Sequence, residues 1–158
     1  LDPDGDSLSV TNLSDPANGT AVLNPDGTVT YTGDQDFNGN DSFTYTPNDG
    51  ASDGNVVTVI ITVNAVNDAP MGTDDDDPTM AENTSLVIDV LLNDSDVEGD
   101  SLNVTNLSDP DNGTAVVNPD GTVTYAPDVD FTGEDTFTYT PNDGLLDGNV
   151  VTVTVTVS

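Results

Sequence analysis

Hydrophobic and polar residues alternate most regularly at the end of the chain. Val151, Val153, Val155 and Val157 are separated by threonines, so an extended segment here has one apolar and one polar side. A period of two residues predicts a β-strand that is buried on one side and solvated on the other. Residues 57–63 repeat the pattern, and no segment has a convincing helical period. The chain is therefore predicted to be all-β.

Further short strands are predicted between turn sequences. In the second half of the chain we expect a strand at Leu102 and Val104, and others at residues 113–118, 122–126 and 136–140. The tripeptide between residues 118 and 122 is Pro-Asp-Gly, in which proline sets φ and glycine accepts a positive φ. Several short strands at this spacing are typical of a β-sandwich.

The chain contains one long internal repeat. When residues 1–64 are aligned with residues 95–158, an offset of 94, 47 of the 64 positions are identical. A unit of this length is too long for a solenoid repeat and predicts domains in tandem. We expect β-sandwich domains at residues 1–66 and 73–158, joined by a linker at residues 67–72.

The two copies are predicted to be unequal. Residues 85–92 form a candidate strand ahead of Ser95, but Ser95 aligns with Leu1, so the first copy has no counterpart of this strand. A sandwich without an edge strand exposes unpaired backbone. Because the first residues resemble the middle of a domain, a truncated sequence is the simple explanation. The alternative is that a neighbouring chain donates the strand and that chains assemble into a fibre by β-strand addition.

The charge excludes most catalytic chemistry. The chain has 30 acidic residues and no Lys, Arg, His or Cys, which gives a formal net charge of −30. It therefore has no Ser-His triad, Cys nucleophile, Schiff-base lysine or Cys/His zinc site, and we predict no enzymatic activity. Binding to nucleic acid or to an anionic membrane is disfavoured, and no apolar run is long enough for membrane insertion. Self-repulsion on this scale favours bound cations.

The most regular acidic pattern lies in a loop that follows the extra strand. Carboxylates occupy alternate positions around Gly99, and oxygens placed in this way can converge on Ca²⁺, which takes 6–8 oxygen ligands. An EF-hand is excluded because its closing glutamate and flanking helices are missing. The candidate ligands are Asp94, Asp96, Glu98 and Asp100, and in the first copy Asp2, Asp4 and Asp6. A solvated turn is the alternative.

Two further acidic groups are candidates for metal binding. Asn67 and Asp68 precede Pro70 at the domain junction, where we expect them to face residues 94–100 and to offer oxygens to an interdomain ion. A second group lies in predicted loops, where turn formation explains the residues equally well: Asp49, Asp53, Asp143 and Asp147. The run of four aspartates at residues 74–77 is expected to be solvated, although it lies near the junction.

Five segments of the second copy, most of them repeated in the first, form a recognisable set: Asn93–Leu102, Asn112–Thr114, Asp120–Tyr125, Phe131–Tyr139 and Asn142–Gly144. Together they resemble the bacterial cadherin-like and Ig-like tandem repeats of large surface adhesins, including RTX-type adhesins. The resemblance covers both copies.

The resemblance implies seven-stranded Greek-key sandwiches in long arrays that calcium stiffens at the junctions. By carry-over, Asn67 and Asp68 become interdomain ligands, and Glu82 matches an acidic residue near the start of the domain. Asn64 stands where the cadherin linker commonly has aspartate, so this chain departs from the full ligand set.

We therefore expect a calcium-stiffened extender repeat of a bacterial extracellular adhesin or surface fibre. Its expected partners are neighbouring repeats, homotypic fibre contacts, and glycans or another cell surface. An alternative is a carbohydrate-binding module of a secreted polysaccharide-degrading protein. Such modules usually present exposed aromatic side chains, whereas the four Tyr and four Phe here lie in strand patterns or next to them. Another alternative is an acidic surface that serves solubility in salt and holds no specific ion.

Overall fold

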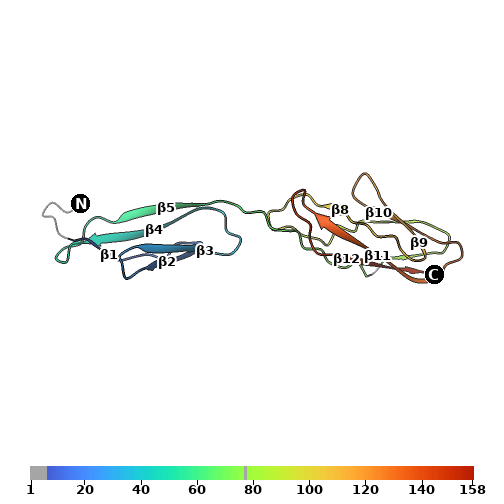
Figure 1. Ribbon diagram of the computed structural model, residues 1–158, viewed down its shortest axis with the longest axis horizontal. Coiled ribbons are helices and arrows are strands. Elements are labelled where there is room, and N and C mark those ends of the chain that lie inside the picture. Colours follow the sequence, from blue (N-terminus) through green and yellow to red (C-terminus); the bar gives the residue numbers. More distant parts are fainter. Residues whose placement is uncertain (1–6, 77) are drawn as a thin grey trace. The chain divides into compact units, whose positions relative to one another are not determined.

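The computed structural model describes residues 7–76 and 78–158. The chain divides into two compact units, Leu1–Val66 and Asn67–Ser158. Strands, turns and loops account for all of the described residues, as Figure 1 shows. A helix with the length and apolar character needed to cross a membrane is not found among them. The predictions of an all-β chain and of two β-sandwich domains are confirmed.

The first unit has five strands among its described residues. They are β1 (Ser9–Thr11), β2 (Gly19–Leu23), β3 (Val29–Gly33), β4 (Gly39–Asn48) and β5 (Val57–Val63). One sheet has the order β1-β4-β5 and the other contains β2 and β3, with antiparallel neighbours throughout. Among the described strands of this unit, β5 and β3 each have a neighbour on one side only.

The second unit has the same five strands and two more. Its seven strands are β6 (Thr79–Met80), β7 (Leu86–Ile88), β8 (Asn103–Thr105), β9 (Gly113–Val117), β10 (Val123–Pro127), β11 (Gly133–Asn142) and β12 (Val151–Val157). The sheets have the orders β6-β12-β11-β8 and β7-β10-β9, so the chain crosses repeatedly between them as in a Greek key. Strands β8 to β12 match β1 to β5 residue for residue at the offset of 94.

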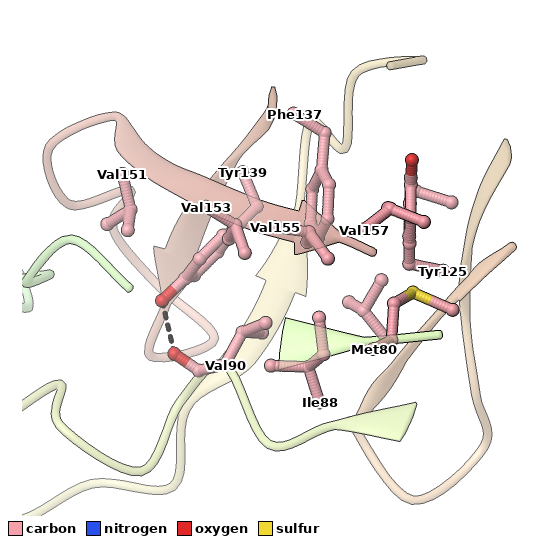
Figure 2. Close-up of a cluster of buried hydrophobic side chains, with 12 residues drawn as sticks. Met80, Ile88, Val90, Tyr125, Phe137, Tyr139, Val151, Val153, Val155 and Val157 are labelled. Carbon is pink, nitrogen blue, oxygen red and sulfur yellow. Dashed lines mark hydrogen bonds between the residues drawn. The ribbon is translucent and has the colours of Figure 1, made fainter. Parts of the chain in front are cut away.

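The core of the second unit lies between the two sheets. The four valines of β12 are 0–2% exposed, which confirms the predicted alternation in this copy. Figure 2 shows them in a row together with Tyr125, Phe137 and Tyr139. Met80, Ile88 and Val90, all from the segment ahead of Ser95, complete the same cluster.

In the first copy the predicted burial of the corresponding strand is wrong. Val57 is 36% exposed where its counterpart Val151 is 0% exposed, and Val59, Ile61 and Val63 are only half-buried. The reason is the missing cover. In the second unit β6 pairs with β12 and β7 pairs with β10, whereas no strand in the described part of the first unit pairs with the free edge of β5 or of β3.

The extra strand is shorter than predicted. A strand was expected at residues 85–92, but β7 ends at Ile88 and a turn follows. In that turn the Leu92 N–H donates to the Asp89 carbonyl at 3.3 Å and the Asp94 N–H donates to the Leu91 carbonyl at 3.2 Å. Inward and outward side chains still alternate from Leu86 to Val90, so the apolar pattern continues past the last strand hydrogen bonds into the turn, where Val90 is buried.

Candidate functional site

Two acidic segments lie side by side at one end of the second unit. Met71 and Ser95 exchange both backbone hydrogen bonds, at 2.8 and 3.0 Å. The Thr73 N–H donates to Asp94 Oδ1 at 2.8 Å, and Asn93 Nδ2 donates to the Thr73 carbonyl at 3.2 Å. We call residues 67–76 and 93–100 the acidic end of the second unit.

Asp94 connects the acidic end to the buried core. Its Oδ2 accepts a hydrogen bond from the Tyr139 hydroxyl at 2.8 Å. The buried carbonyl of Val90 is the second acceptor of the same proton, so one hydroxyl is shared between two acceptors; Figure 2 draws the contact to Val90. Burial, and then the neighbouring Asp94 carboxylate, raises the pKa of Tyr139, so this hydroxyl stays a donor at all ordinary pH values.

Asp75 is half-buried against β12. The expectation that the run at residues 74–77 is solvated is therefore wrong for Asp75, and the last residue of the run lies outside the described part. The Asp75 N–H donates to the Thr152 carbonyl at 3.0 Å, and the Thr154 N–H donates to the Asp75 carbonyl at 2.9 Å. Burial and the negative charge of Asp94 raise the pKa of Asp75 from 3.8 to about 6. Its buried Oδ2 has no hydrogen-bond partner among the described residues. Nothing in a run of identical residues marks this position.

Asp96 organises the predicted calcium loop. Its Oδ1 accepts the N–H groups of Glu98 and Asp100, both at 3.0 Å, while Gly99 takes a φ of +76° to close the turn. Its Oδ2 is buried and has no hydrogen-bond partner in the described part of the chain. The Asp68 N–H donates to Glu98 Oε2 at 3.1 Å, so residues 67–68 do lie against this loop within the second unit.

The other predicted ligands of this unit mainly stabilise turns. Asp143 Oδ1 accepts the N–H groups of Leu145 and Leu146 at 2.6 and 2.7 Å, and its Oδ2 accepts from Asn67 Nδ2 at 2.7 Å. These hydrogen bonds, above all that from Leu146, lower the pKa of Asp143. Asp147 Oδ1 accepts from the Asn142 side chain at 2.8 Å.

The first unit repeats this turn. Asp49 Oδ1 accepts the N–H groups of Ala51 and Ser52, both at 2.7 Å, and these bonds lower its pKa. Asp53 Oδ1 accepts from the Asn48 side chain at 2.8 Å. Turn formation therefore engages one oxygen of each carboxylate in both copies.

The remaining predicted ligands are not brought to the acidic end. The Glu82 N–H donates to the carbonyl of Ser158, whereas Asp75 bonds to Thr152 near the start of β12. Six residues of strand separate these points, roughly 20 Å. Asp2, Asp4 and Asp6 lie outside the described residues.

The family of the chain follows from comparison with known proteins. The profile of the bacterial Ig domain matches residues 1–62 and 67–158. The chain belongs to this family. Bacterial Ig domains are typical of surface and secreted proteins. The search of curated proteins found no match.

The solved structures show that these bacterial Ig domains have a cadherin-like fold. The chain is similar to human mucin-like protocadherin EC1-2, with 16% identity and a TM-score of 0.59 over 100% of this chain and 86% of that one. It is also similar to mouse clustered PcdhgC3 EC1-3, with 12% identity and a TM-score of 0.53 over 100% of this chain and 57% of that one.

The bacterial Ig domains of this chain also match part of larger enzymes. The endo-fucoidan hydrolase MfFcnA4 of glycoside hydrolase family 107 is 26% identical, with a TM-score of 0.37 over 98% of this chain and 24% of the hydrolase. The chain thus spans about a quarter of the length of that protein.

The acidic end of the second bacterial Ig domain fits a calcium ion in part. All of its ligand atoms are oxygens, as calcium prefers, and the two unpaired buried oxygens of Asp75 and Asp96 lack a positive partner. No group of three acidic side chains within residues 7–76 and 78–158 is close enough to hold a metal ion. Backbone carbonyls and water would therefore have to supply the other ligands, which calcium accepts.

Proposed function

We propose that the chain is a calcium-stiffened extender of a bacterial extracellular adhesin or surface fibre, of the kind found in RTX-type proteins, and that it has no catalytic role. Two Ig-like domains in tandem that are identical at 47 of 64 aligned positions support a spacer role, because a repeat adds length without adding a new site. The observation that carries the calcium part is the pair of buried, unpaired carboxylate oxygens at the acidic end, on Asp75 and Asp96.

Calcium would act here by neutralising charge. Asp75, Asp94 and Asp96 belong to two segments that backbone hydrogen bonds already hold together, so an ion between those segments would lock residues 67–76 onto the domain. A bound ion would supply positive charge that this chain, with no Lys, Arg or His, does not have. The first residues of the domain would lose freedom, and an array of such domains would become stiffer.

The experiment compares the melting temperature and small-angle scattering of the full chain in calcium and in chelator. Binding to the folded state alone adds RT ln(1 + [L]/Kd), about 3 kcal/mol at a hundredfold excess over Kd. We expect chelator to lower the melting temperature by several degrees and to broaden the distribution of interdomain distances. Identical melting and scattering curves in both buffers would refute the proposal.

A pair of double variants separates a specific site from a general effect of charge. Asp75→Asn with Asp96→Asn removes the two unpaired oxygens and should abolish the calcium-dependent shift. Asp109→Asn with Asp111→Asn removes two exposed carboxylates from a loop and should leave the shift intact. Equal losses in both double variants would favour an acidic surface that only screens its charge with whatever cation is present.

Burial of the aromatic residues counts against the carbohydrate-binding alternative. Tyr125, Phe137 and Tyr139 are 0–1% exposed, and the other five aromatic side chains are buried or half-buried. A sugar platform usually presents an exposed aromatic face. We expect a glycan array to show no binding by the 158-residue chain.

A further inference from the structure

The chain contains three Asn-Gly pairs, a sequence that is prone to a spontaneous reaction of the main chain. They are Asn18-Gly19, Asn38-Gly39 and Asn112-Gly113. The nitrogen of the glycine can attack the side-chain amide carbon of the asparagine, because glycine has no Cβ to hinder the approach. In a folded protein the reaction depends on how firmly the pair is held, and the three pairs differ in this respect.

Two of the pairs are fixed by hydrogen bonds of the asparagine main chain. The Asn18 N–H donates to Asp41 Oδ2 at 3.0 Å, and the Asn18 carbonyl accepts from the Asp34 N–H at 3.0 Å. In the same way the Asn112 N–H donates to Asp135 Oδ2 at 3.0 Å. The two accepting carboxylates are only 5% and 4% exposed, so the groups that hold these asparagines are themselves fixed in the interior.

The glycines of these two pairs also have little room. A Cβ on Gly19 would lie 2.4 Å from the Thr32 carbonyl oxygen, and one on Gly113 would lie 2.5 Å from the Ala126 carbonyl oxygen. Both asparagines are half-buried. The attack requires the main chain to rotate until the glycine nitrogen meets the side chain, and backbone packed this closely resists the rotation.

The third pair is held much less firmly. Asn38 and Gly39 are both exposed, and Asn38 has no hydrogen bond to a described residue from its main chain or its side chain. The nearest atom to a Cβ on Gly39 would be Phe37 Cζ at 3.9 Å, which leaves the glycine open space. Gly39 begins β4 and faces Val63 in the last pair of that ladder, and the end of a ladder opens at little cost.

The fold does not require asparagine at this position. In the second unit Thr132 stands in its place, ahead of Gly133, and the two glycines have nearly the same φ, +121° for Gly39 and +127° for Gly133. The loop thus takes the same course with a threonine, which has no amide to lose. The second unit therefore supplies a matched control residue for the first.

We propose that Asn38 is a site of spontaneous deamidation in the folded chain, whereas the fold protects Asn18 and Asn112. The Gly39 nitrogen loses its proton and bonds to Asn38 Cγ, the Cγ–Nδ2 bond breaks, and ammonia leaves. Water then opens the cyclic imide. Opening at Cγ gives aspartate, and opening at the main-chain carbonyl carbon gives isoaspartate, in which the chain runs through the side chain. The reaction consumes water, releases ammonia and needs no enzyme or cofactor.

Both products change the first unit at the start of β4. Each adds a negative charge to a chain that already carries −30. Isoaspartate also lengthens the main chain by one carbon directly before Gly39, so the pairs of Gly39 with Val63 and of Asn40 with Thr62 lose their register. The modification therefore records the age of the protein as a loosened strand end, and it does not depend on calcium.

The test ages the full chain in neutral buffer and follows each asparagine by peptic digestion and electron-transfer fragmentation, which distinguishes isoaspartate from aspartate. We expect Asn38 to lose its amide at least about tenfold faster than Asn18 or Asn112, because these two react only after local opening. In urea the three rates should converge. Asn38→Thr should keep the fold and remove the reaction at this position. Equal rates in the folded chain would overturn the proposal, as would a lead of Asn38 that persists unchanged in urea.

A second measurement separates the longer main chain from the added charge. Hydrogen–deuterium exchange of the aged chain should show lost protection at residues 62–63 in the isoaspartate fraction. Asn38→Asp carries the same charge with a normal main chain, so it should keep that protection. Unchanged protection in the isoaspartate fraction, or an equal loss in Asn38→Asp, would overturn the inferred loss of register.

Discussion

At the scale of single residues, position in the repeat decides the role of a conserved side chain. Tyr45 and Tyr139 have the same sequence neighbours from Phe to Gly, yet only Tyr139 reaches the partners supplied by residues 90–94. Removing only one partner of a buried hydrogen bond costs stability, because the other partner stays buried without a hydrogen bond. The two tyrosines should therefore differ in their contribution to stability.

We predict that Tyr139→Phe destabilises the second unit by about 1–3 kcal/mol, because the Val90 carbonyl and Asp94 Oδ2 would lose their donor. Tyr45→Phe, the matched control in the other repeat, should change the stability of the first unit by less than about 0.5 kcal/mol. Urea unfolding followed by hydrogen exchange distinguishes the units. Equal effects of the two substitutions would contradict the difference in burial.

Asp75 gives a prediction for pH dependence. Its pKa is about 6 in the folded chain, above its ordinary value of 3.8. Between about pH 4 and 6 the folded state keeps a proton that the unfolded state has lost, so this residue makes stability fall as pH rises through that range. Asp75→Asn should therefore raise the melting temperature by a few degrees above pH 6 in calcium-free buffer.

The comparison for this prediction is Asp76→Asn, which removes the same charge from an exposed neighbour. Because Asp75 is only half-buried, solvent screens part of the effect and the gain should be modest. Near pH 4 the variant and the native chain should melt together. A gain that is constant from pH 4 to 8, or equal in both variants, would mean that net charge rather than the buried carboxyl is responsible.

At the scale of elements, the number of neighbouring strands determines how much a core residue contributes to the stability of its domain. Strand β12 lies between β6 and β11, whereas the matching β5 has a neighbour on one side only among the described strands. Val153 is 0% exposed and Val59 is half-buried. The same side chain in the same local sequence thus buries different amounts of apolar surface.

We predict that Val153→Ala costs about 2–3 kcal/mol, from the loss of two buried methyl groups and the cavity that they leave. Val59→Ala should cost about 1 kcal/mol or less, because its site is already partly open to water. Denaturant unfolding of the full chain measures both changes.

The sequence predicted those elements that depend only on the residues within them. The alternation at residues 151–157, the Pro-Asp-Gly turn after Asn118 and the strand around Phe137 all follow from short-range rules and are present in the structure. Strand β6 was missed because two residues carry no period. The burial of Asp75 was missed because it depends on packing against β12, which is distant in sequence, and the exposure of β5 because it depends on which strands pair with its edge.

The candidate site was only partly predictable for a similar reason. Alternating carboxylates in a Gly-containing loop indicated residues 94–100, and Asp96 does organise that loop. The sequence could not show which carboxylate oxygens would lack a hydrogen-bond partner, because that depends on the way residues 67–76 pack against β12. The spacing of acidic residues does not specify this packing. Asp49 and Asp143 were also candidate ligands, because an aspartate in a loop can either bind a metal ion or stabilise a turn. In the structure each accepts hydrogen bonds from the backbone of its own turn.

At the scale of the whole molecule, the 158 residues carry a net charge of −30 and no basic side chain, and the resulting self-repulsion opposes the compact state. We predict that the melting temperature in chelator rises steadily between 0.1 and 1 M NaCl, over which the screening length falls from about 10 to 3 Å. Millimolar calcium should produce its shift on top of this trend. Sucrose at matched osmolality is the control, and an equal rise in sucrose would exclude charge screening as the cause.

The parallel pairing of β6 with β12 also decides how the second unit carries a pulling force. These strands lie near opposite ends of the unit's sequence and run in the same direction, so tension between its two ends slides one along the other. All the hydrogen bonds between residues 75–82 and β12 are then loaded at once rather than opened one by one. The second unit is therefore expected to resist stretching until this whole interface shears at once.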